Sequence, residues 1–316
     1  MSEVTYETKK TESKFCKAKR NFLKEKEIWL ICIPMIIWVA IFCYYPMWGN
    51  LMAFVRYIPG KEIFQCKFVG LKYFKQFFQS PDFSIVMRNT LAISGLGILF
   101  GFPAPIILAL LINELRNKHF KKAVQTISYL PHFVSWVVTA SLIFSFLSAD
   151  GLVNEILLKL GTIDTPISFL GEGKYFWKII TSANIWKEIG WSSIIYLSAM
   201  SGIDSELYDA GAVDGLGRWG MVWHITLPGI RNTIALLFIL GLGGILNAGF
   251  EQQLLLGAPQ TRDYWDVIDT YTYRYGIQMG NYSYATAVGL MKAAIGFTLV
   301  LLTNKIVKKY FDVTVI

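Results

Sequence analysis

Long apolar runs alternate with shorter polar segments along this chain of 316 residues. The six runs lie near residues 28–50, 90–114, 125–148, 178–200, 232–256 and 284–306. Each run is long enough to cross a bilayer as a helix, which takes about 20 residues. The fourth contains Lys187 and Glu188, so we expect it to face protein rather than lipid. The pattern predicts an all-α membrane protein with six transmembrane helices.

The polar segment 201–230 contains a short amphipathic helix of its own. Asp204 is placed to cap the start of this helix, and Gly215 and Gly217 are placed to end it. An apolar stripe at helical spacing is formed by Leu207, Ala210, Val213 and Leu216. The loop offers nothing against which this stripe could pack, so we expect another protein or a membrane surface to cover it.

Composition and charge agree with a membrane protein. Hydrophobic residues make up 54% of the chain and charged residues 16%, which is more apolar than a soluble domain. Residues 1–27 form a separate basic tail with eight Lys or Arg and five Glu. We expect this tail to be solvated or to lie on anionic lipid, and the run from Ile28 to be kept as a signal anchor.

The basic residues also indicate an orientation, because cytoplasmic loops are enriched in Lys and Arg. The turn 115–124 and the C-terminal segment are basic, and with six spans both lie on the side of the N-terminal tail. Segment 51–89 holds six Lys or Arg and argues the other way. We predict that both termini and the 201–230 loop are cytoplasmic.

The sequence gives little support to catalysis. The four Cys and three His are scattered, without metal-ligand spacing or a nucleophile motif. No phosphate-binding G-x-x-x-x-G-K-[ST] loop is present, so the chain cannot hydrolyse ATP by itself. A secondary transporter would show two similar halves, and a membrane enzyme acting on glycans would need paired carboxylates or a metal site. We expect no catalytic residue, no metal and no cofactor bound by this chain, and no nucleic-acid partner.

The 201–230 loop resembles a known motif. Asp209-Ala210-Gly211 is followed after three residues by Gly215, and after nine more by Ile225-Thr226-Leu227-Pro228. This spacing is similar to the EAA loop of ABC importer permeases, E-A-A, three residues, G, nine residues, I-x-L-P. Asp209 stands for the Glu and Gly211 for the second Ala. An ordinary interfacial amphipathic helix is the alternative.

The resemblance implies a type I ABC importer (MetI-like) permease fold over residues 28–316. In that family the loop helix couples the permease to a groove on the ATP-hydrolysing subunit. Asp209 would meet a cation there, and Gly215 would provide the turn out of the helix. The residues expected to couple are Asp209, Ala210, Gly211, Val213, Gly215 and Leu216.

Further segments look like the oligosaccharide and polysaccharide branch of sugar permeases, which is similar to the maltose-type permeases. They include YYPMWGNLMAFVRY (44–57), SYLPHFVSWVV (128–138), IWKEIGWSSIIYLSAMSGID (185–204) and NYSYATAVGLMK (281–292). This resemblance implies a saccharide substrate, a second permease subunit, two ATP-binding subunits that use ATP and Mg, and an extracellular solute-binding lipoprotein at a bacterial cell membrane. A permease of the same fold for an amino acid, peptide or ion is the alternative function.

Polar and aromatic residues inside the runs are candidates for a saccharide site. Asn247 and Glu251 would share one helix face, and Lys187 is one turn from Trp191. The full set is Trp186, Lys187, Trp191, Asn247, Phe250, Glu251, Tyr284 and Lys292. The charged members could instead pair with one another or with the sister permease. Lys187 and Glu188 point about 100° apart on a helix, so both cannot face one cavity. Lys292 hints at an anionic sugar, and Asp269 could form a cavity lip or a docking surface.

Overall fold

The computed structural model describes residues 26–311, in two units that span residues 1–52 and 53–316. The described part of the first unit is residues 26–52. It consists of α2 (Lys26–Val39), the π-helical turn η1 (Ala40–Tyr44), α3 (Tyr45–Met47) and most of the 3₁₀ turn η2 (Trp48–Phe54). The expected basic tail lies outside the described residues except for its last two positions.

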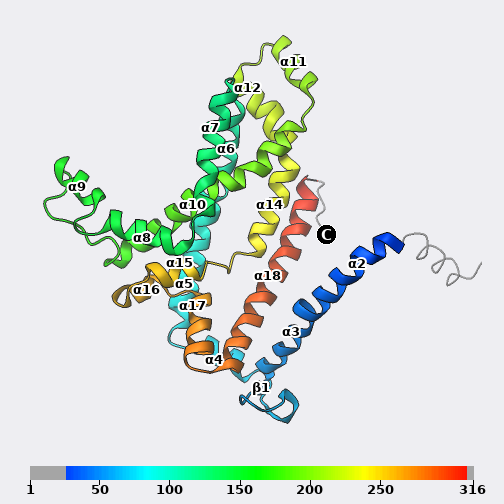
Figure 1. The fold of residues 1–316 in the computed structure, drawn as a ribbon, viewed down its shortest axis with the longest axis vertical. Helices are drawn as coiled ribbons and strands as arrows, with labels where there is room; N and C mark the ends of the chain where they lie inside the picture. Colours follow the sequence, from blue (N-terminus) through cyan, green and yellow to red (C-terminus); the bar gives the residue numbers. More distant parts are fainter. Residues whose placement is uncertain (1–25, 312–316) are drawn as a thin grey trace, which may run out of the picture. The chain divides into compact units, whose positions relative to one another are not determined.

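The second unit is a bundle of helices (Figure 1). Its longer helices are α4 (Lys72–Phe78), α5 (Phe83–Leu96), α6 (Pro103–Asn113), α7 (Lys118–Tyr129), α8 (Trp136–Leu147), α9 (Leu152–Lys159), α10 (Gly173–Ser201), α11 (Ser205–Val213), α14 (Arg231–Gly243) and α18 (Tyr282–Phe311). Its shorter helices are α12 (Arg218–Met221), α13 (Leu227–Gly229), α15 (Glu251–Leu256), α16 (Arg262–Trp265) and α17 (Ile268–Tyr273). In the described part of the chain the strands are β1 (Val55–Arg56) and β2 (Lys67–Phe68), which pair antiparallel.

Several turns depart from α-helical geometry. The π-helical turns of the second unit are η4 (Gly97–Gly101), η6 (Val222–Thr226) and η8 (Arg274–Gln278). The 3₁₀ turns are η2 (Trp48–Phe54), η3 (Ile63–Gln65), η5 (Leu130–Phe133) and η7 (Pro259–Thr261). π-Helical turns occur frequently at functional sites, and η4 borders the cavity described below.

Four helical stretches of the described chain are long and apolar enough to cross a membrane. They are Glu27–Phe54, Phe83–Asn113, Trp136–Lys159 and Tyr282–Lys308. A fifth stretch results if the bent helix pair Arg218–Gly229 and Arg231–Gly243 counts as one span; the bend between the two helices is 61°. This bend follows Pro228, where the sequence predicts a break. Helix α10 has 29 residues, but its polar side chains keep it out of this set. The all-α membrane fold is confirmed, and the count of six spans is not.

The predicted third span is wrong, because its helix does not run from 125 to 148. Helix α7 ends at Tyr129 and the 3₁₀ turn η5 follows, with Pro131 in its first turn. A new helix then starts at Trp136, where the Ser135 side chain accepts a hydrogen bond from the Val138 backbone N–H. A proline and an N-cap together separate the two helices.

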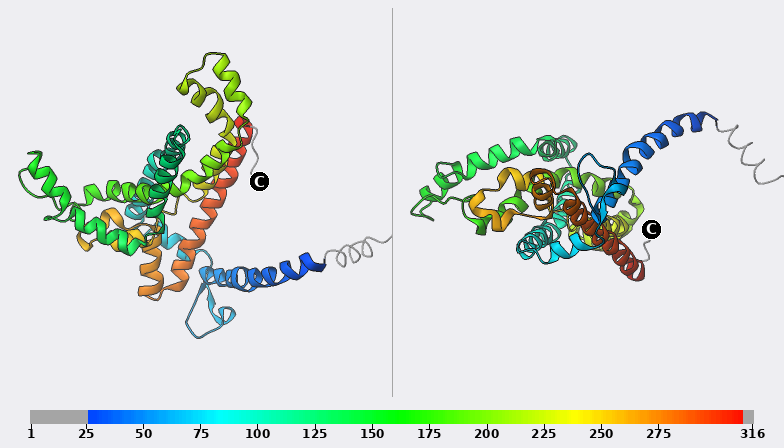
Figure 2. Two further views of the ribbon diagram at one scale, coloured as in Figure 1. Left: turned by 45° about the horizontal axis from the view of Figure 1, so that its top comes forward. Right: turned by 90° about the horizontal axis from the view of Figure 1, so that it is seen from below.

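The predicted fifth span is also wrong, because α14 ends at Gly243 and residues 244–250 are not helical. Helices α14 and α18 lie side by side (Figures 1 and 2). A Cβ on Gly243 would stand 2.3 Å from the Val300 side chain, and a Cβ on Gly296 would stand 2.7 Å from the Gly243 carbonyl oxygen. Gly243 therefore packs against α18, as predicted for this glycine-rich stretch. Asn247 and Glu251 do not share a helix face.

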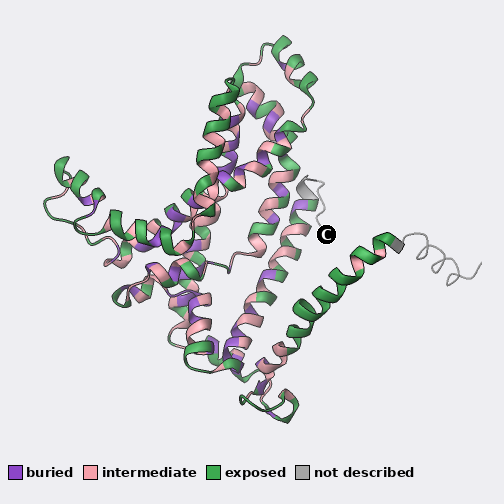
Figure 3. Cartoon of the chain, viewed as in Figure 1, coloured by how far each residue is buried: buried purple, intermediate pink, exposed green. Residues whose placement is uncertain are grey.

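The buried residues of the second unit lie along the centre of the bundle (Figure 3). One cluster joins α4, α5, α17 and α18 through Phe77, Val86, Tyr271 and Tyr284. A second joins α6, α10 and the start of α14 through Ala109, Tyr196 and Ile230. Helix α10 thus crosses the bundle with neighbours along its length, as expected of a polar helix that faces protein.

Candidate functional site

Helix α11 begins and ends as the sequence predicts. The Asp204 side chain accepts a hydrogen bond from the Glu206 backbone N–H at 3.0 Å. At the other end, the Leu216 N–H donates to the Gly211 carbonyl at 2.9 Å and the Gly215 N–H to the Ala212 carbonyl at 3.1 Å. These two bonds form a Schellman motif, and Gly215 has the positive φ (+79°) that this motif requires.

The two sides of α11 differ in burial. Tyr208 faces the bundle, and its hydroxyl lies 3.0 Å from the hydroxyl of the buried Thr226. Gly211 is buried too, because an added Cβ would stand 2.8 Å from Ile225 and 3.2 Å from Leu216. An Ala side chain there would need the terminal methyl of Ile225 to shift.

The other side of α11 is open. Leu207 is 54% exposed and Val213 is 88% exposed, and Asp209 and Ala210 lie on the same exposed surface. The helix lies at one tip of the bundle (Figures 1 and 3). Of the six residues expected to couple, Asp209, Ala210 and Val213 offer side chains to a partner. Gly211 and Leu216 pack inward, and Gly215 sets the turn.

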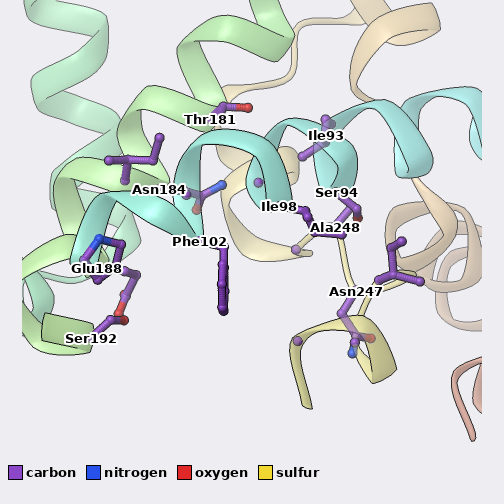
Figure 4. A pocket seen from close by; sticks show the side chains of 18 of the residues that line it. Ile93, Ser94, Ile98, Phe102, Thr181, Asn184, Glu188, Ser192, Asn247 and Ala248 are labelled. Carbon is purple, nitrogen blue, oxygen red and sulfur yellow. The ribbon is translucent and has the colours of Figure 1, made fainter. Parts of the chain in front are cut away.

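A cavity of about 400 Å³ lies between α5, the π-helical turn η4, α10 and the irregular segment 244–250 (Figure 4). Its polar lining residues are Ser94, Thr181, Asn184, Glu188, Ser192, Asn247 and Gln252. Phe102 and Phe238 form an aromatic part of the wall, with ring centroids 5.3 Å apart. Aromatic faces beside a few polar groups are typical of ligand pockets.

The polar side chains on α10 form a regular row. Thr181, Asn184, Glu188 and Ser192 are spaced by three, four and four residues, so they share one helix face. The hydroxyls of Thr181 and Ser94 are buried and form no hydrogen bond within the described residues. A buried hydroxyl without a partner is costly, and the polar groups open to a solute come from other lining residues such as Asn184, Glu188 and Asn247.

Lys187 lies on a different face of α10. Its ammonium group donates to the carbonyls of Pro131 (3.3 Å), His132 (2.6 Å) and Val134 (2.7 Å), and the side chain is buried. Its aromatic partner is Trp136, 5.9 Å from the ring centroid, rather than the expected Trp191. Glu188 faces the cavity and Lys187 does not, which confirms that these two neighbours point in different directions.

Glu188, Trp191 and Trp186 lie near Lys187 in the sequence but contact other groups. His132 Nδ1 lies 2.8 Å from Glu188 Oε2, and the His132 ring stacks on Trp191 with centroids 4.4 Å apart. Trp186 lines an apolar cleft of about 570 Å³ between α8 and α10. Lys187, Glu188 and Lys292 therefore do not pair with one another within this chain, and the alternative that they pair with the sister permease stays a prediction.

Lys292 forms an ion pair with Asp269, which places Asp269 against α18 rather than free in a loop. Both residues line a cleft of about 700 Å³ together with Asn247 and Thr272. Asn247 also lines the cavity of Figure 4, so it borders both spaces.

The other three substrate candidates lie apart from the cavity in Figure 4. Phe250 packs edge-on against Tyr273, and Glu251 is exposed at the start of α15. Tyr284 is buried, and its hydroxyl lies 2.5 Å from that of Tyr271. The substrate roles of all eight residues stay predictions.

A charged cluster joins α5, α16 and η8. Asp82 accepts from Arg262 (3.1 Å) and Arg274 (3.2 Å), and Asp266 pairs with the same arginines at 3.2 and 2.8 Å. Burial raises the pKa of Asp266, and hydrogen bonds from Thr270 and Arg262 oppose this rise. The cluster holds together segments about 180 residues apart.

Sequence reasoning missed the polar row on α10 and this charged cluster. The row has a signal in the sequence, because Thr, Asn, Glu and Ser recur at helical spacing from 181 to 192. The cluster had no local signal, because its members come from distant segments.

The fold and the loop helix define a class of membrane permease, and a comparison with protein families agrees. Residues 101–312 match the family of binding-protein-dependent transport system inner membrane components. The chain belongs to this family, and it is a component of the inner membrane.

Individual similar proteins give a finer description than the family does. Protein LplB of Bacillus subtilis is 45% identical over 91% of this chain and 90% of its own length. The polygalacturonan/rhamnogalacturonan transport system permease protein YteP of the same organism is 43% identical over 93% and 92%. A crystal structure of a bacterial ABC transporter involved in the import of the acidic polysaccharide alginate contains a chain that is 42% identical, with a TM-score of 0.85 over 93% of this chain and 99% of that one.

Proposed function

We propose that this chain is a permease subunit of an ATP-driven importer for oligosaccharides, with acidic polysaccharide fragments as its substrate class. The main support is the similarity above 40% identity, over more than nine-tenths of the chain, to permeases for polygalacturonan and alginate. The cavity in Figure 4 adds physical support, because its aromatic wall and polar lining residues suit a sugar.

The proposed assembly contains a second permease, two ATP-binding subunits and an extracellular solute-binding lipoprotein. A related alginate transporter structure includes a periplasmic protein with bound alginate pentasaccharide, which supports such a partner. The exposed stripe and Asp209 on α11 dock on an ATP-binding subunit, where ATP and Mg are bound. On this basis we propose that α11 and both chain termini are cytoplasmic, and that the end of the bundle that carries α4 and α17 is outside.

The experiment is uptake into vesicles that contain the complete importer, with ATP supplied on the side of α11. Labelled trigalacturonate is expected to accumulate only with ATP and the binding protein, whereas maltotriose and glutamate accumulate at least about tenfold less. Accumulation of glutamate instead would contradict the saccharide assignment. No ATP-dependent uptake of any of the three solutes would contradict it as well.

Replacing Thr181 with valine tests the cavity. The side chain keeps its shape and loses the unpaired hydroxyl, so we expect KM for the saccharide to rise about threefold to tenfold, without loss of thermal stability. The matched control is Thr139→Val, because the Thr139 hydroxyl is buried too but donates to the Ser135 carbonyl at 3.0 Å. That variant should lose stability and keep KM. Equal KM values in Thr181→Val and the parent importer would remove Thr181 from the pathway.

A further inference from the structure

A second polar hollow lies at the end of the bundle formed by α4, η8 and the start of α18, away from α11 (Figure 1). Its volume is about 790 Å³, within the range of pockets that hold small ligands. It is lined by Val69, Leu71, Lys72, Lys75, Gln76, Gln79, Ser80, Pro81, Tyr271, Tyr275 and Tyr284. It shares no lining residue with the cavity in Figure 4.

The floor of this hollow is a chain of hydroxyl groups. Tyr271 OH lies 3.2 Å from the Ser80 hydroxyl and 2.5 Å from Tyr284 OH. Two hydrogen bonds use two of the three hydroxyl protons, so one proton is left for a ligand. The rings of Tyr271 and Tyr284 are fully buried, and burial raises the pKa of Tyr271, which keeps its phenol protonated.

The rim of the hollow is positively charged. Lys72 and Lys75 are exposed and three residues apart, so both lie on one side of α4. Neither forms an ion pair within the described residues, and no Asp or Glu lines the hollow. The nearby carboxylate of Asp82 is neutralised by Arg262 and Arg274. The lining therefore offers ammonium, amide and hydroxyl donors without a competing acid.

We infer that this hollow binds a carboxylate-bearing sugar unit of the saccharide at the outer end of the bundle, before the saccharide enters the pathway. The carboxylate pairs with Lys72 and Lys75, and sugar hydroxyls bond to Gln76, Gln79 and the Ser80 hydroxyl, which the two buried tyrosines hold in place. This inference rests on the proposed function and on the outward orientation proposed for this end. An acidic segment of the binding protein is the competing occupant, and the charge of the rim would suit it too. The size of the hollow and the hydroxyl chain at its floor favour the sugar.

The test compares Lys72→Gln/Lys75→Gln with the parent chain, each paired with the partner permease in lipid nanodiscs. Calorimetry measures the Kd for trigalacturonate and for its trimethyl ester, in which all three carboxylates are esterified and uncharged. Loss of two charge-assisted contacts is expected to raise the Kd for trigalacturonate about tenfold or more. The Kd for the trimethyl ester should be high in both proteins. The matched control is Lys61→Gln/Lys67→Gln, which removes the same charge from exposed residues outside the hollow.

An unchanged Kd for trigalacturonate in Lys72→Gln/Lys75→Gln would overturn the inference, whatever else changes. If the same variant also binds the saccharide-free binding protein more weakly, the hollow is a protein docking site. Either result leaves the proposed function intact as long as the importer still accumulates trigalacturonate with ATP. Failure of that accumulation in the parent importer is the separate result that defeats the proposed function.

Discussion

ATP-driven uptake is expected to fall about tenfold or more when Gly215 is replaced by valine, with the chain still present in the membrane. Gly215 has φ = +79°, and a β-branched residue strongly disfavours that conformation. An added side chain meets no atom within 4 Å, so the cost comes from the backbone and not from a clash. Relief of the strain would break the Schellman bonds and turn α11 away from its partner. Uptake and ATP hydrolysis by the reconstituted importer measure the effect.

Two variants make this experiment specific. Gly217→Val changes a glycine two residues away that has φ = −73° and equally open surroundings, so uptake should be kept. Gly215→Asn should retain most of the uptake, because asparagine tolerates positive φ. Equal uptake by Gly215→Val and Gly217→Val would show that the turn at Gly215 does not position the coupling helix.

The coupling helix could be predicted from the sequence because its signals are local. Asp204 caps a neighbouring N–H, and the helix ends where the Gly215 N–H donates to Ala212 and the Leu216 N–H donates to Gly211. The packing of Gly243, where α14 ends, could not be predicted in the same way, because its neighbours Val300 and Gly296 of α18 are more than fifty residues away.

The candidate site also combines features that have a local signal in the sequence with features that have none. The sequence identified intramembrane charges as unusual, and the structure gives partners to three of them, Lys187, Glu188 and Lys292. The sequence alone could not identify these partners, because Lys187 binds backbone carbonyls at the turn η5 and Lys292 binds Asp269. Glu188 lines the cavity, and the other polar side chains there, such as Thr181 and Asn184, are uncharged types that alone do not distinguish a pathway from ordinary helix packing.

Replacing Lys187 with methionine should produce the largest loss of stability of any single change in α10. The ammonium group is the donor shared by three carbonyls of the segment that joins α7 to α8. Methionine fills similar space but leaves these carbonyls without that donor, at about 1–3 kcal/mol for each one left unsatisfied. We expect the thermal midpoint of the purified permease pair to fall by roughly 5 °C or more.

The matched control is Lys178→Met, which removes an exposed lysine from the same helix and should change the midpoint little. KM for the saccharide separates the two interpretations of Lys187. If Lys187 only holds η5 against α10, its replacement lowers stability and the amount of assembled importer. The KM of the importer that remains is then unchanged. A stable Lys187→Met permease with a raised KM would mean that Lys187 contacts the saccharide, because loss of the carbonyl contacts alone does not change affinity while the fold is kept.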